Sequence, residues 1–265
     1  MAAAVTDRSI GTQTTARRSI FSLILFGIAF GYVEAAIVVY LRVIGAPLRA
    51  AAGLPVQELF PLLRLDQLTP ATISLLRIEL AREASTLIMI WAVSRTARSR
   101  LGAFVLAFGV WDLAFYLWLR VLIGWPASLL TWDLLFLLPV PWASPVLAPT
   151  LVAATMTAFG VWLLSREPRR TQSLLPMLLL AAGAAVLLIS FLWDWRRWLA
   201  GGAPQAFPWL IFAAGEMLVI FGFLAFSRGA IFEKSPGEDQ CQSSTTSAAV
   251  VERDSKSWYS SLPPT

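Results

Sequence analysis

Long apolar runs separated by short loops with arginines dominate the chain, and they predict a bundle of membrane-spanning helices. The runs expected to form helices cover residues 20–41, 69–94, 101–123, 145–165, 174–192 and 207–226. A helix rises about 1.5 Å per residue, so about 20 apolar residues cross the ~30 Å hydrocarbon core of a bilayer. The first run is longer than the apolar part of a secretory signal, which favours an uncleaved helix. The expected fold class is an all-α polytopic membrane bundle with six transmembrane helices.

Prolines and glycines mark where several of these helices should begin and end. Thr69 is a good helix cap because its hydroxyl can accept a backbone N–H, and Pro70 suits the first helical position, where no N–H is needed. Gly124-Trp125-Pro126 should end the third helix. Residues 128–138 are apolar but too short to cross a bilayer, and the prolines at 139, 141 and 145 then prevent regular helix. We expect a short helix there that lies at the interface or dips in and returns.

Composition supports a membrane protein and removes several kinds of chemistry. The 265 residues are 57% hydrophobic and 14% charged, whereas soluble domains are nearer ~25% charged. The chain has no histidine, which excludes Ser-His-Asp and Cys-His catalysis and makes haem and zinc sites unexpected. Its single cysteine, Cys241, lies in a polar tail and leaves no internal disulfide. No cofactor is evident, although carboxylates alone would suit a divalent cation such as Mg²⁺, Mn²⁺ or Ca²⁺.

The arginines indicate topology and not nucleic acid binding. The net charge is +5, but the basic residues cluster at the ends of the apolar runs. The arginines of loops 95–100 and 166–170 fall on the same side of a six-helix bundle as both termini, and this side is the cytoplasm by the positive-inside rule. The expected divisions are a cytoplasmic segment over 1–18, the transmembrane domain over 19–228 and a disordered cytoplasmic tail over 229–265.

Ionisable side chains inside the apolar runs are the candidate functional residues. Charges are costly in hydrocarbon, so they usually face a partner or a cavity. Helical spacing places Glu79 and Glu83 on one stripe, with Arg82 beside it. On a rise of about 1.5 Å per residue, most of the acidic residues fall in the middle to outer part of the membrane. The candidate ligand-binding residues are Glu34, Arg42, Arg77, Glu79, Arg82, Glu83, Asp112, Tyr116, Arg120, Asp133 and Glu216.

Two interpretations of this charged layer remain open. Its carboxylates and arginines nearly balance, which favours an internal ion-pair network that fixes helix packing. The alternative is a binding site that opens outward, where arginines hold an anionic headgroup or spare carboxylates hold a proton or a metal ion. Asp133 is expected to form a cap or a surface ion pair, or to face the site if the 128–138 segment folds over the bundle as a lid. Gly31 and Gly109 are expected where the first and third helices approach closely.

Three stretches carry a family resemblance. They are GYVEAAIVVYLR at 31–42, ELAREAST at 79–86, and the run that begins VWDLAFYLWLR at 110 and ends PVPW at 142. These stretches resemble a group of uncharacterised bacterial multi-spanning membrane proteins, over about residues 27–150. The resemblance implies an inner-membrane location and no known activity.

The first functional hypothesis is a small transporter or permease-like protein that binds a solute or a lipid headgroup at the charged layer. An alternative is a membrane enzyme that acts on a lipid-borne substrate through carboxylate chemistry, with or without a divalent metal. A third hypothesis is a non-catalytic subunit of a membrane complex. The expected partners are membrane lipids, together with another membrane protein or further copies of this chain.

Overall fold

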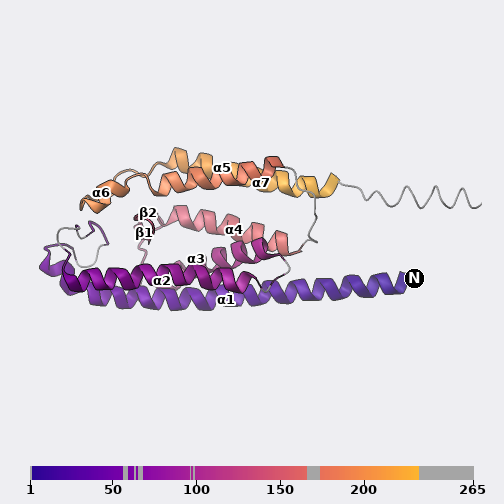
Figure 1. Ribbon diagram of the computed structural model, residues 1–265, viewed down its shortest axis with the longest axis horizontal. Coiled ribbons are helices and arrows are strands. Elements are labelled where there is room, and N and C mark those ends of the chain that lie inside the picture. Colours follow the sequence, from indigo (N-terminus) through magenta and orange to yellow (C-terminus); the bar gives the residue numbers. More distant parts are fainter. Residues whose placement is uncertain are drawn as a thin grey trace, which may run out of the picture.

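Long helices that run along one common axis make up most of the described chain (Figure 1). The computed structural model describes residues 2–55, 59–62, 64, 68–95, 97, 99–165 and 174–232. The elements in chain order are α1 (Ala2–Ala51), α2 (Pro70–Ser94), α3 (Arg100–Ile123), β1 (Trp132–Phe136), β2 (Trp142–Pro145), α4 (Leu147–Ser165), α5 (Leu174–Phe191), α6 (Trp195–Leu199) and α7 (Trp209–Phe232). The arginines at 166, 169 and 170 and the tail from 233 onward lie outside the described residues.

Five helical stretches of the described chain are long and apolar enough to cross a membrane. They are Ala16–Ala51, Arg100–Ile123, Leu147–Ser165, Leu174–Leu199 and Trp209–Ser227. Helix α2 has 25 residues, enough for about 37 Å, but its charged side chains set it apart from these five. The expectation of a mostly helical membrane fold is therefore confirmed, with five candidate spans.

The structure confirms the expected boundaries of two helices. Thr69 precedes α2, and its hydroxyl accepts the N–H of Thr72 at 3.3 Å, while Pro70 occupies the first helical position. Helix α3 ends at Gly124, whose φ of 67° is in the left-handed region that glycine adopts without steric penalty. Local side-chain chemistry therefore determines where these helices begin and end.

The expected short helix within 128–138 is wrong, because the chain forms a β-hairpin there. Strand β1 pairs antiparallel with β2, and Asp133 lies opposite Ser144. The hairpin approaches the bundle from the end where α6 also lies (Figure 1). The two strands pair along one edge only, and non-helical chain at membrane depth is tolerated where it is buried in protein.

Glycines set the closest helix contacts. A Cβ added at Gly31 of α1 would lie 2.8 Å from Ala114 Cβ of α3, which confirms the close approach expected at Gly31. Gly109 does not face α1 as expected: a Cβ there would lie 2.6 Å from the carbonyl oxygen of Ala153 in α4. Helices α1, α3 and α4 therefore pack in that order, with α5 and α7 paired in a further layer (Figure 1).

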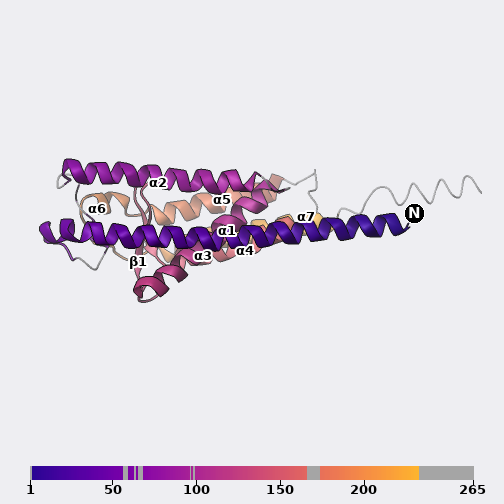
Figure 2. The ribbon, with the colours of Figure 1, turned by 90° about the horizontal axis from the view of Figure 1, so that it is seen from below.

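Helix α2 is the outlying member of the bundle. It packs along α3 but makes little backbone contact with α1 over their described lengths. Figure 2 shows the two helices apart, with other elements visible between them. Contact between α1 and α2 is therefore made mainly by side chains, among them Arg82 of α2 and Glu34 of α1.

Candidate functional site

A partly enclosed cavity of about 620 Å³ lies between α1, α2, α3, the hairpin, α4 and α5. Pockets that hold small organic molecules are usually ~300–1,000 Å³, so this volume suits such a ligand. The wall combines charged and aromatic side chains. Its aromatic members are Phe104, Phe108, Trp111, Phe115, Tyr116, Phe136, Trp142 and Phe191.

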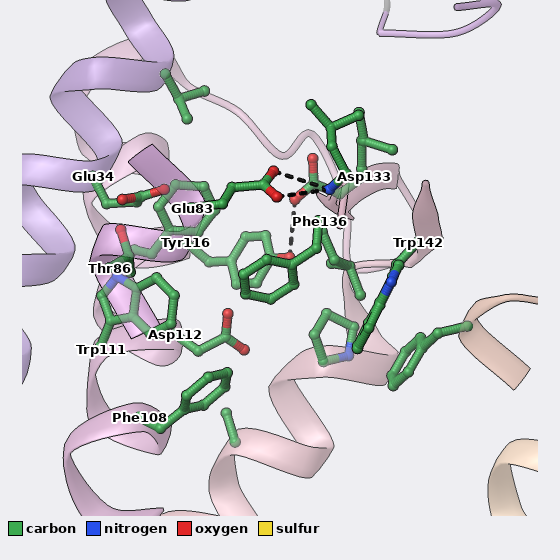
Figure 3. Close-up of a pocket in the computed structure, with 18 of the residues that line it drawn as sticks. Glu34, Glu83, Thr86, Phe108, Trp111, Asp112, Tyr116, Asp133, Phe136 and Trp142 are labelled. Atoms are coloured by element: carbon green, nitrogen blue, oxygen red, sulfur yellow. Dashed lines mark hydrogen bonds between the residues drawn. The ribbon is translucent and has the colours of Figure 1, made fainter. Parts of the chain in front are cut away.

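Most of the candidate residues from the sequence meet at this cavity. They come from α1, α2, α3 and β1, so the charged layer spans elements that are distant in sequence (Figure 3). The candidates that line the cavity are Glu34, Arg42, Glu79, Arg82, Glu83, Asp112, Tyr116 and Asp133.

Three candidates lie away from the cavity. Arg77 is exposed on α2. Arg120 donates a hydrogen bond to the carbonyl of Pro126 at 2.9 Å, which ties it to the chain after α3. Glu216 accepts a hydrogen bond from the hydroxyl of Thr155, between α7 and α4. The single shared layer expected from the sequence is thus divided between the cavity and other contacts.

Arg82 joins two glutamates at the α1 side of the cavity. Its Nε lies 2.9 Å from each carboxylate oxygen of Glu79, one turn away on α2. Its Nη1 donates to Glu34 of α1, so one guanidinium serves both carboxylates. Charge-assisted bonds of this kind are the strong ones, and they bridge the two helices that otherwise barely touch.

Glu83 holds the chain between the two strands. Its oxygens accept the N–H of Leu137 at 2.9 and 3.0 Å, and one of them also accepts the N–H of Leu138 at 3.3 Å (Figure 3). The residue is only 4% exposed. The carboxylate therefore satisfies backbone donors that leave the strand pairing at this point, and it fixes the hairpin to α2.

Asp133 and Tyr116 form a buried pair. The Tyr116 hydroxyl donates to Asp133 Oδ2 at 2.9 Å, and both residues are about 6% exposed. Burial raises the pKa of Asp133 to about 6, although the hydrogen bonds from Tyr116 and the Leu134 N–H and the positive charge of Arg42 all act to lower it. Asp133 is thus buried inside the bundle and is not a surface residue.

Arg42 of α1 also lines the cavity. Its guanidinium carbon lies 4.3 Å from the ring centre of Trp125, which gives a cation–π contact. Arg49, about two turns further along α1, donates to the carbonyls of Leu59 and Pro61 at 3.1 Å each. Both cations of this region are therefore engaged by neighbouring chain.

Asp112 differs from the other carboxylates of the wall. Within the described chain, no hydrogen-bond donor reaches its oxygens. Figure 3 shows its carboxylate directed into the cavity, in the region of Phe108 and Phe136. Buried polar groups in proteins are normally hydrogen bonded, so an unpartnered carboxylate at a cavity wall is a feature that needs a reason.

Several residues of the wall could not be identified from the sequence. Phe136 and Trp142 reach the cavity because the hairpin folds into the bundle, and the Leu137 N–H matters only as a backbone donor. The 128–138 stretch is rich in leucine, which suits helix at least as well as strand, so no sequence signal marks it. The prolines after it were the only indication of irregular chain.

Comparison of the chain with protein-family models, curated proteins and solved structures gives no match. Within the described residues, no group of three or more His, Cys, Asp or Glu side chains is placed to hold a metal ion. The chemistry that the cavity can support therefore follows from its own side chains.

Proposed function

We propose that the protein is a small permease-like membrane protein that binds a solute in the cavity between α1, α2, α3 and the hairpin. The observation that carries the proposal is a cavity of about 620 Å³ whose wall holds charged side chains from several elements. Charges inside membrane proteins commonly mark substrate pathways. A purely structural ion-pair network would leave no reason for an open space beside its charges.

The proposal includes six spans in a bacterial inner membrane, with both termini in the cytoplasm. Helix α2 would be the sixth span, because three of its charged residues, Glu79, Arg82 and Glu83, line the cavity. Arginines at the ends of the apolar runs support this orientation through the positive-inside rule. The hairpin and α6 would then lie toward the outer side.

The state of the arginines favours a solute over an anionic lipid headgroup. Arg82 already serves two carboxylates, Arg49 donates to backbone carbonyls, and Arg42 lies over an indole ring. An anionic headgroup would have to displace these contacts. The permease-like proposal therefore needs no free cation in the cavity wall.

Thiol accessibility tests the proposal. In a Cys241→Ser background, Val38→Cys places a thiol on the cavity wall, and Val33→Cys places one on an exposed position of the same helix, where Val33 is 49% exposed. A membrane-impermeant maleimide is applied to right-side-out and inside-out vesicles. A permease that alternates its opening should expose Val38→Cys from both sides, whereas the lipid-facing control should react slowly from either.

Labelling of Val38→Cys from one side only would overturn the permease part of the proposal. Absence of labelling from both sides would overturn the proposal as a whole, because the cavity would not be reached by solutes. Recovery of a stably bound second polypeptide, together with unlabelled Val38→Cys, would favour the membrane-complex subunit instead.

A further inference from the structure

The carboxyl groups of the cavity wall differ in their hydrogen-bond partners. Glu34 and Glu79 share the Arg82 guanidinium, Glu83 accepts backbone N–H groups, and Asp133 accepts from Tyr116. Asp112 has no hydrogen-bond donor within the described chain and is directed into the cavity (Figure 3). The Asp112 carboxylate is therefore available to bind a ligand in the cavity.

A continuous aromatic surface adjoins this carboxylate. The ring of Trp111, the residue before Asp112, lies 5.0 Å from that of Phe108 and 6.4 Å from that of Phe136. The Phe136 ring in turn lies 5.6 Å from that of Trp142. We call these four residues, Phe108, Trp111, Phe136 and Trp142, the aromatic wall. Aromatic faces carry partial negative charge and attract organic cations.

The balance of acidic and basic groups in the cavity also favours a cation. Five carboxylates line it against three guanidiniums. All three guanidiniums already have partners, so acidic groups are in excess where the ligand would lie, and a cation bound beside Asp112 would favour its ionised form. A low-dielectric cavity strengthens the attraction of a cation to such an excess.

We infer that the solute is a lipophilic organic cation, such as a hydrophobic amine or a quaternary onium ion. Its charge lies against the Asp112 carboxylate, and its apolar groups lie on the aromatic wall. This inference rests on the proposed function, because it names the solute class that the cavity takes. A hard metal ion suits the site less well, because such ions need several oxygen ligands and the surface around Asp112 is largely aromatic.

Two ions of nearly equal size and shape but opposite charge test the inference. Radiolabelled tetraphenylphosphonium and tetraphenylborate are dialysed to equilibrium against the purified full-length protein, with protein-free micelles as the blank. The wild type should bind the cation above the blank and should not bind the anion. Asp112→Asn should weaken cation binding by about tenfold or more, since a charged contact in a low-dielectric site is lost.

Glu216→Gln is the matched control, because it also removes a carboxylate from a long helix but lies outside the cavity. It should leave cation binding unchanged. Phe108→Leu should weaken binding by roughly two- to fivefold through loss of one ring of the aromatic wall. Equal binding of both ions, an absence of cation binding, or an equal effect of Asp112→Asn and Glu216→Gln would overturn the inference.

The thiol experiment separates this failure from failure of the proposed function. If tetraphenylphosphonium does not bind but Val38→Cys is labelled from both sides, the solute class is wrong and the permease-like proposal stands. If tetraphenylphosphonium binds, it should also protect Val38→Cys from the maleimide. Binding without protection would place the cation outside the cavity and overturn the inference.

Discussion

The carboxylate of Glu83 holds the backbone of Leu137, 54 residues further along the chain, with both of its oxygens. The contact joins α2 to the hairpin, and the hairpin in turn brings Asp133, Phe136 and Trp142 to the cavity. A side chain that would be costly in hydrocarbon therefore replaces the hydrogen bonds that a helix would have supplied to this part of the backbone. Glu83 is better described as a positioning residue than as a ligand contact.

Glu83→Ala should destabilise the protein by about 1–3 kcal/mol, because the Leu137 and Leu138 N–H groups lose their acceptor inside the bundle. Glu83→Gln keeps one acceptor oxygen and should lose less than half as much. Thermal unfolding in detergent measures both, at roughly 2–4 °C per kcal/mol for a protein of this size. Equal losses in the two variants would show that the carboxylate does not act through these hydrogen bonds.

Arg82→Met should be more damaging, by about 3–5 kcal/mol, because it leaves two carboxylates in the bundle without their guanidinium. Adding Glu34→Gln and Glu79→Gln to Arg82→Met removes the unpaired charges and should recover a large part of the lost stability. The unfolding temperatures of the single and triple variants decide the matter. A triple variant no more stable than Arg82→Met would mean that the ion pairs contribute little.

The helices were predictable because their signals are local. Long apolar runs gave the helix positions, and Thr69 with Pro70 marked the start of α2. Helical spacing also placed Glu79, Arg82 and Glu83 together, and these residues do line one cavity. The same signals predict six membrane spans, whereas five helices of the described chain are apolar enough to be candidate spans. The difference is α2, which carries more charge than an apolar span.

The rest of the site depends on contacts between distant parts of the chain. The hairpin could not be predicted because its leucine-rich sequence is compatible with helix, and its hydrogen bonds to Glu83 appear only in three dimensions. The sequence makes both Arg120 and Asp112 candidate site residues, yet Arg120 bonds to the carbonyl of Pro126 beyond the helix end. The sequence predicts Gly109 at the contact of α3 with α1, but the residue lies at a close contact of α3 with α4.

Gly31→Ala should weaken the packing of α1 on α3. The added Cβ would lie 2.8 Å from Ala114 Cβ and 2.9 Å from the backbone nitrogen of Phe115, so the helices must separate. Overpacking of this kind usually costs about 1–3 kcal/mol. Gly45→Ala is the control on the same helix, because no atom lies within 4 Å of its added Cβ, and it should be neutral or stabilising by up to ~1 kcal/mol. Similar unfolding temperatures for the two variants would contradict the close approach.

Asp133 should make the stability of the protein depend on pH in a defined direction. Burial raises its pKa from the ordinary 3.8 to about 6 in the folded state. The folded protein therefore binds this proton more tightly than the unfolded chain, so protonation favours folding. Stability from this group should rise as the pH falls from about 7 toward 4, at about 1.4 kcal/mol per unit of pKa difference, and it should be lowest above pH 6.

Asp133→Asn removes the titration but keeps an oxygen that can accept from Tyr116, so it isolates the effect of this one group. The variant should gain in unfolding temperature relative to the wild type above pH 6, and the gain should shrink as the pH falls toward 4. Tyr116→Phe should instead lower the unfolding temperature above pH 6, because it removes a hydrogen bond that lowers the pKa of Asp133. The unfolding temperature should then depend more steeply on pH. A wild-type advantage that grows with rising pH would show that the Asp133 carboxylate is stabilised in the ionised form, and that Arg42 and Tyr116 outweigh its burial.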